Sequence, residues 1–293
     1  MDMSAQIIQL LVAGITTGSI YAIVAVGFNV IFKSTDAINF AQGEWVMMGG
    51  MVAAACYAVA ELPLWLSCLA AVALVALAGG LSDAGDPSAE KARAPAGDAA
   101  QHRPGHLYQK PGDAGAGQNA DGLSRILGRH AGAAGGRADS AAELLGDGGG
   151  AALHAGHAFL LRAHPAGQDL RATAIDRDAA ALVGINVRRS VTVAFVLAAL
   201  AGGIAGVIIA PLTFTSYDHG TMLGFKGFSA AMLGGLGSLQ GALLGGVLLG
   251  VIEALGGGLI SSQYKDALSF IVLLLVLFYR PQGLLGKAEI NKV

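Results

Sequence analysis

The sequence is poor in charged residues. Only 13% of its 293 residues are Asp, Glu, Lys or Arg, about half of the roughly 25% found in an average soluble domain, whereas 54% are hydrophobic. This composition excludes an ordinary soluble domain and favours a membrane protein.

The sequence also lacks the motifs of nucleotide-binding and hydrolytic proteins. It contains no G-x-x-x-x-G-K-[ST], and the nearest string, Gly283–Ala288, has neither the spacing nor the hydroxyl that a phosphate-binding loop needs. G-x-S-x-G and H-E-x-x-H are absent too. The two cysteines, Cys56 and Cys68, lie in or beside apolar runs, where packed thiols are expected. We therefore expect no enzyme and no cofactor bound by this chain.

Long uncharged runs are what the sequence has instead. Ile7–Phe32 holds 26 residues without a charge, which as a helix measures about 39 Å and exceeds a hydrocarbon core of about 30 Å. Four more uncharged runs follow at Leu62–Leu81, Ser190–Tyr217, Gly227–Ile252 and Ala267–Tyr279. The pattern predicts an all-α, multi-pass bundle of transmembrane helices in the lipid bilayer of a cell inner membrane.

Residues 82–167 interrupt this pattern and divide the chain into 1–81, 82–167 and 168–293. The segment is rich in Ala, Gly, Asp, Arg, Pro and His, and it contains six of the seven histidines. Such a composition cannot bury enough apolar surface to offset the entropy of ordering, so it predicts disorder. A soluble insertion and a linker are two explanations, and we favour a third, the frameshifted translation of a membrane-spanning stretch. His154 and His157 are three apart there, but we expect no metal site.

An arginine-rich loop precedes the run that starts at Ser190. Five arginines lie between Arg162 and Arg189, and short loops rich in Arg or Lys favour the cytoplasmic side. Alanines are strong helix formers and Gly184 suits a helix end, so Arg171–Ile185 predicts a short surface helix. An ordinary charged connector is the alternative.

A glycine cluster, Gly234-Gly235-Leu236-Gly237-Ser238, interrupts the run Gly227–Ile252. Broken helices at membrane depth are tolerated where they are buried or line a watery cavity, and in transporters they often lie near the path. We therefore expect a half-helix, a turn and a full helix. An even number of crossings between a cytoplasmic Arg-rich loop and a cytoplasmic C-terminal tail requires the same break.

Three polar residues lie between the first two apolar runs and are candidates for a translocation path: Asn39, Gln42 and Glu44. Ionisable groups within a membrane are costly, which makes Glu44 a functional candidate. A re-entrant turn or an interfacial loop is the alternative interpretation of this stretch. Gly234, Gly235 and Gly237 complete the candidate path.

Three blocks resemble the permeases of branched-chain amino acid ABC transporters. They read GSIYAIVAVGFNVIFKSTDAINFAQGEWVMMGG, GQDLRATAIDRDAAALVGINVRR and FKGFSAAMLGGLGSLQGALLGGVLLGVIEAL. The resemblance covers Met1 to about Gly80 and about Gly167 to Val293, roughly 200 residues, and it leaves out the anomalous segment. By this resemblance the following residues match the loop that contacts the ATPase: Gly167, Arg171, Ala172, Asp176, Ala179, Ala180 and Gly184.

The resemblance implies an ATP-driven importer with several subunits, in which ATP is hydrolysed by partner subunits. The expected partners are a second permease subunit, cytoplasmic ATP-binding subunits and a periplasmic substrate-binding protein, and no nucleic acid. Branched-chain or related amino acids are the implied substrates; amides, urea or another small polar solute are the alternative. A nonfunctional permease remnant is the third possibility, because the anomalous segment replaces about two spans.

Overall fold

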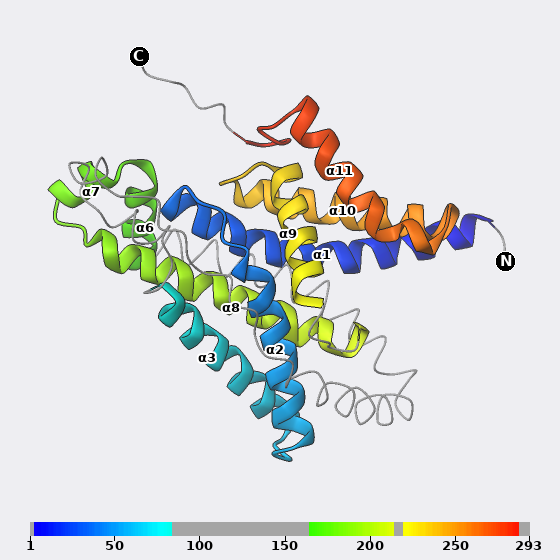
Figure 1. Ribbon diagram of the computed structural model, residues 1–293, viewed down its shortest axis with the longest axis horizontal. Coiled ribbons are helices and arrows are strands. Elements are labelled where there is room, and N and C mark those ends of the chain that lie inside the picture. The colour runs from blue at the N-terminus through cyan, green and yellow to red at the C-terminus, as the bar shows by residue number, and fades with distance from the viewer. Residues whose placement is uncertain (1–2, 84–163, 214–218, 287–293) are drawn as a thin grey trace, which may run out of the picture.

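The structure is a computed structural model that describes residues 3–83, 164–213 and 219–286. All the regular elements in these residues are helices, which confirms the all-α prediction (Figure 1). They are α1 Met3–Thr35, α2 Ala41–Ala58, α3 Leu64–Ser82, α6 Pro165–Ile175, α7 Arg177–Leu182, α8 Val187–Thr213, α9 His219–Gly234, α10 Leu239–Leu259, the 3₁₀ turn η2 Ser262–Tyr264 and α11 Lys265–Tyr279.

Five of the described helical segments are long and apolar enough to cross a membrane. They are Met3–Thr35, Leu64–Ser82, Val187–Ala210, Leu239–Leu259 and Ser262–Tyr279. Large apolar side chains on α3 and α11, such as Leu77 and Phe278, are exposed, as expected where a helix faces lipid. The chain is therefore a multi-pass membrane protein.

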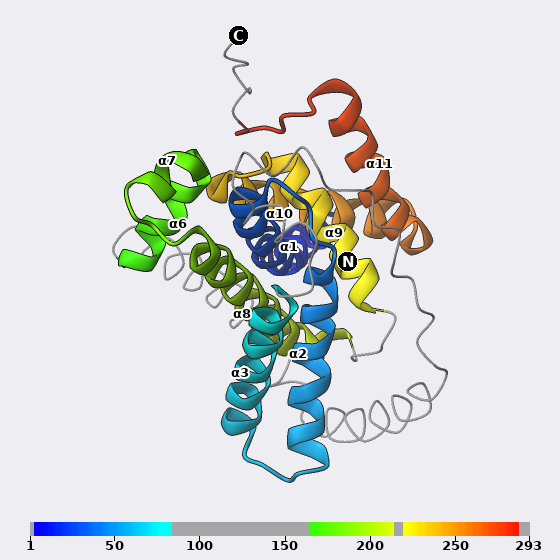
Figure 2. The same cartoon turned by 60° about the vertical axis from the view of Figure 1, so that its left-hand side comes forward.

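Helix α1 is the centre of the bundle. Figure 2 looks nearly along its axis and shows α2, α8, α9 and α10 around it. From Ile20 to Ile31 every residue of α1 is buried, and Asn29 is fully buried among apolar neighbours. A helix that is apolar on all sides belongs inside a bundle.

The glycines of α1 and α10 let these two helices touch through their backbones. A Cβ atom on Gly18 would lie 2.7 Å from the Cα of Val247, and one on Gly250 would lie 2.4 Å from the Cα of Gly18. Gly14 packs against the Cα of Val251 in the same way. In lipid no hydrophobic effect drives helices together, so small residues stabilise such interfaces by letting the backbones pack closely. We call this contact the glycine seam.

The predicted helix break is confirmed. Helix α9 ends at Gly234, α10 begins at Leu239, and Gly235 and Gly237 have φ angles of +109° and +77°. Glycine adopts this left-handed backbone without the steric cost that other residues meet. With its 16 residues α9 is about 24 Å long, shorter than a hydrocarbon core of about 30 Å.

Four helices, α8 to α11, separate the α6–α7 segment from residues 280–286. Only α8, α10 and α11 among them are long and apolar enough to cross a membrane, so the expected even number of crossings stays a prediction. Residues 280–286 return to the break, where the amides of Leu284 and Leu285 donate to the carbonyls of Leu233 and Gly234. The anomalous segment lies almost wholly outside the described residues, as do His154 and His157. Its first two and last four residues are exceptions, since α3 ends at Ser82 and α6 begins at Pro165.

Candidate functional site

Asn29 of α1 holds the turn between α9 and α10. Its Nδ2 donates to the carbonyl of Ser238 at 2.9 Å, and its Oδ1 accepts from the amide of Gly237 at 3.1 Å. Ser238 is the N-cap of α10, because its hydroxyl accepts from the amide of Gly241. The break is therefore fixed by hydrogen bonds: Asn29 gives the amide of Gly237 an acceptor and is a second donor to the carbonyl of Ser238, which also accepts from the amide of Ala242.

The glycines of the break also allow neighbouring backbone segments to pack closely. A Cβ on Gly234 would lie 1.9 Å from the carbonyl oxygen of Gly241, and one on Gly235 would lie 2.3 Å from the amide nitrogen of Gly286. Gly237 has more room, since its nearest neighbour would be Lys33 at 3.7 Å. Gly234 and Gly235 are thus required by close backbone contacts, and Gly237 by its backbone angle.

The three polar candidates before and within α2 take different places. Asn39 Oδ1 accepts at 2.8 Å from the amide of Ala41, the first residue of α2. Gln42 is fully buried, and its Nε2 donates to the carbonyl of Ala198 on α8 at 3.1 Å. Glu44 is exposed in the first turn of α2, near Gly220 at the start of α9. The structure does not bring these side chains together, and their role in a path stays a prediction.

One atom of Gln42 is unusual. Its Oε1 is buried and finds no hydrogen-bond partner among the residues that the structure describes. A Cβ on Gly27 would lie 2.1 Å from Nε2 of the same amide, so the side chain fills the space that this glycine leaves. An unpaired buried carbonyl costs about 1–3 kcal/mol, which makes the contact between α1, α2 and α8 less stable than it could be.

A buried polar cluster joins α1, α9, α10 and α11. Glu253 is 1% exposed, and its Oε1 lies 2.9 Å from Nζ of Lys226 on the half-helix α9. The hydroxyl of Tyr21 donates to Oε1 and that of Ser269 to Oε2, each at 3.1 Å. Each of these four side chains comes from a different helix.

Two further charges border the cluster at the start of α11. Lys265 Nζ lies 3.3 Å from Glu253 Oε1, and Asp266 Oδ1 lies 2.7 Å from Lys226 Nζ. Two lysines and two carboxylates make the group electrically neutral, which limits the cost of burying charge at membrane depth. The polar cluster is the set Tyr21, Lys226, Glu253, Lys265, Asp266 and Ser269.

The polar cluster is not predicted from the sequence. Lys226 and Glu253 are the residues immediately before and after the uncharged run Gly227–Ile252, where charges are expected as the boundaries of a span. Because the run folds back on itself at the glycine break, its two charged ends lie on neighbouring helices and meet. The break predicted near the middle of Gly227–Ile252 is a signal for this pairing, because a run that folds back brings its two ends together.

The Arg-rich segment forms two helices and not one. Asp176 has an extended backbone with φ −159° and ψ 111°, and it ends α6. Its Oδ1 then accepts from the amide of Ala179 at 2.9 Å, which caps the start of α7. The prediction of one continuous helix over Arg171–Ile185 was wrong for this reason. Gly184 follows α7 with φ +89°, as the predicted helix end requires.

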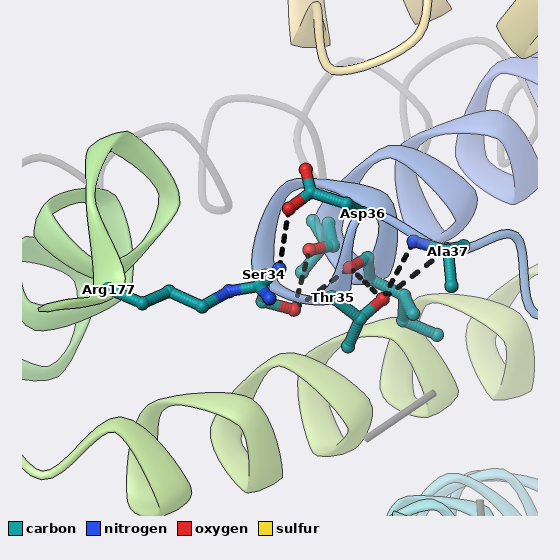
Figure 3. A network of polar contacts seen from close by, with 7 residues as sticks. Ser34, Thr35, Asp36, Ala37 and Arg177 are labelled. Atoms are coloured by element: carbon teal, nitrogen blue, oxygen red, sulfur yellow. Dashed lines mark hydrogen bonds and ion pairs between the residues drawn. The ribbon is translucent and has the colours of Figure 1, made fainter. Parts of the chain in front are cut away.

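Helix α7 is tied to the end of α1. Arg177 Nη2 donates to Asp36 Oδ2 at 2.6 Å, and Asp36 directly follows the last residue of α1 (Figure 3). The hydroxyls of Ser34 and Thr35 fold back onto carbonyls of the last turns of α1. Arg177 is therefore anchored to a short, ordered end of the central helix.

The rest of the α6–α7 segment has a buried face and an exposed face. Gly167, Leu170, Thr173 and Ala180 are buried, whereas Arg171 and Ala179 are exposed and Ala172 lies half-buried between them. Three exposed apolar side chains complete the outer face, and none of them is needed to cover the bundle: Ile175 at 85%, Leu182 at 88% and Val183 at 77%. The segment thus offers a mixed apolar and charged surface.

Comparison with known proteins places this arrangement in a family. The family described as "Branched-chain amino acid transport system / permease component" matches residues 10–83 and 150–277, more than half of the chain. These blocks include α6, α7, the break and the whole polar cluster. The second block begins before Gly167, so the family-like sequence extends further towards the N-terminus than we expected.

Individual relatives are similar to this chain over a shorter stretch than the family match. Across 128 residues the chain is 44% identical to the High-affinity branched-chain amino acid transport system permease protein LivH of Salmonella typhimurium and 43% identical to LivH of Escherichia coli K12. It is 42% identical to the permease protein BraD of Pseudomonas aeruginosa over the same length. These matches span about two fifths of the length of each relative, and no solved structure matches the chain. The chain belongs to the family of branched-chain amino acid transport system permease components.

Proposed function

We propose that this chain is a permease subunit of an ATP-driven importer of branched-chain or related amino acids in the cell inner membrane. The observation that carries the proposal is the family match across both halves of the chain, including α6, α7 and the broken helix. The relatives named as branched-chain amino acid permeases support the substrate class. A second permease subunit, cytoplasmic ATP-binding subunits and a periplasmic substrate-binding protein complete the importer.

In this proposal the α6–α7 segment receives the force of the ATPase. Its exposed Leu182 and Val183 offer an apolar surface to a groove on the partner, and Arg171 and Asp176 lie on the same segment. The ion pair of Arg177 with Asp36 passes a displacement of α7 to α1. An ordinary connector would need no such link to the central helix.

The path runs beside the half-helix α9. A 16-residue helix that ends in a glycine turn leaves backbone at membrane depth, which is tolerated where it lines a cavity or is buried. Asn39, Gln42 and Glu44 lie at the start of α2, which packs on α9 through Gly43 and Gly224. A rearrangement of this contact would give the unpaired Gln42 Oε1 a partner, either water or substrate.

Reconstitution tests the proposal. The full chain is co-expressed with the partner subunits of its own gene neighbourhood, purified as a complex and placed in proteoliposomes with labelled L-leucine and ATP. ATP-dependent uptake that excess isoleucine or valine inhibits is the expected result. Uptake inhibited by urea or acetamide instead would favour the small polar solute. Absence of both uptake and substrate-stimulated ATP hydrolysis would mark the chain as a remnant.

The nucleotide sequence tests the anomalous segment separately. The codons for residues 78–172 are resequenced and translated in three frames. Apolar spans in a neighbouring frame would support a frameshift, whereas polar sequence or stop codons in both other frames would exclude it.

A further inference from the structure

A pocket of about 220 Å³ lies between α1, the C-terminal half of α10 and the start of α11. At about 30 Å³ for each water molecule it has room for roughly seven waters, or for a ligand the size of a small amino acid. Its walls come from helices that the glycine seam and the polar cluster already hold together. The pocket is thus part of the packed bundle and not of a loose terminus.

The lining of the pocket has one anion, one cation and an apolar side. Glu253 and Lys265 line it, together with the hydroxyl residues Thr17 and Ser262. Leu10 and Ala13 of α1 are among the apolar residues of the lining. Glu253 is almost completely buried, so its carboxylate is a fixed group with a defined direction.

From this lining we infer that the pocket binds the zwitterion of an amino acid with a small apolar side chain. The α-carboxylate pairs with Lys265 and Ser262, the α-ammonium pairs with Glu253, and the side chain lies against Leu10 and Ala13. The inference rests on the proposed function for the identity of the amino acid, but the pairing of charges comes from the pocket itself.

A zwitterion is the ligand that leaves the charge balance of the pocket unchanged. Lys265 Nζ and Glu253 Oε1 lie 3.3 Å apart. A ligand with one positive and one negative end enters between them and gives each a new partner. A simple amine or a simple carboxylate would add a net charge beside the buried Glu253 and the half-exposed Lys265, which is unfavourable.

Neutral solutes fit less well. Urea and acetamide would have to separate the ion pair without returning an opposite charge to either partner. The Lys226 ammonium holds Glu253 in place, since it contacts the same Oε1 atom from α9. The pocket therefore discriminates an amino acid from the small polar solutes that are the alternative substrates.

Photolabelling of the full complex in proteoliposomes tests the inference. The probe is a diazirine analogue of L-leucine, and labelled peptides are located by mass spectrometry. Label is expected in the peptides of α1 and α10 that contain Ala13 and Glu253. Excess L-leucine should remove the label, whereas isoamylamine and 4-methylpentanoate, each of which lacks one charged end, should not.

Three variants separate binding from folding. Glu253→Gln and Lys265→Met each remove one charge, and Ala13→Phe fills the pocket from an exposed position of α1 without touching the charges. Each should lower the specific label at least tenfold. Glu61→Gln is the matched control, because Glu61 is an exposed carboxylate between α2 and α3 and should label like the unaltered chain.

The outcomes distinguish this inference from the proposed function. Leucine uptake by the unaltered complex, with label outside these peptides or unchanged label in Ala13→Phe, would refute the proposed binding site but not the proposed importer. Specific label in the pocket without any uptake would support the site and refute the importer.

Discussion

The hydrogen bonds of Asn29 give the clearest test of how the broken helix is held. In Asn29→Leu the new side chain has nearly the same size and shape, but the amide of Gly237 loses its acceptor, whereas the carbonyl of Ser238 keeps the amide of Ala242 as a donor. Asn29 is fully buried, and Gly237 and Ser238 are partly buried. An unpaired buried group costs about 1–3 kcal/mol, so the loss of the Gly237 acceptor should lower the free energy of unfolding by about 1–3 kcal/mol.

Unfolding in mixed micelles of a mild detergent and SDS measures this difference, with Trp45 and Trp65 as fluorescent probes. Gln9→Leu is the matched control, because Gln9 is an exposed amide on the same helix and should change stability by less than about 0.5 kcal/mol. Equal unfolding free energies for the two variants would refute the reasoning, since the turn would then need no support from α1.

Three further predictions concern the contacts around α1. Arg177→Ala should change the unfolding free energy by less than about 1 kcal/mol, because the ion pair is exposed. It should nevertheless uncouple ATP hydrolysis from uptake. Restoration of coupling by exchanging the charges of Arg177 and Asp36 would show that the ion pair itself is responsible. Lys226→Met should destabilise the chain by about 2–4 kcal/mol in the same micelles, and adding Glu253→Gln should recover part of that loss. A double variant less stable than Lys226→Met alone would contradict the idea that the two charges balance each other. Gly18→Leu should cost at least about 1–3 kcal/mol, because its Cβ would lie 2.7 Å from the backbone of α10, and an unchanged unfolding curve would show that the glycine seam opens easily.

The sequence predicted the architecture best where composition is extreme. Uncharged runs located the spans, and the glycine cluster located the break, because positive φ angles and backbone contact both require glycine there. The helix boundaries differ by a few residues, since α1 extends past the uncharged run to Thr35. Charge alone does not end a helix at a membrane border.

The predicted site was less complete, because it depends on contacts between distant residues. Gln42 and Glu44 are two residues apart, yet the helix turns one into the α8 interface and leaves the other exposed. Glu253 meets Tyr21, which lies 232 positions earlier in the sequence. No local pattern indicates such a pair without the fold.

The central helix also has a mechanical consequence. Thirty-three residues form a rod of about 50 Å, with Asp36 directly beyond one end and Leu10 of the pocket near the other. A rotation of about 10° around its middle would move each end by roughly 4 Å, because half the rod is about 25 Å long. The glycine seam makes α10 follow the same swing, whereas α11 packs on α9 and α10 from outside. A displacement of α7 would therefore rotate α1 about its middle, and the pocket would open or close against α11.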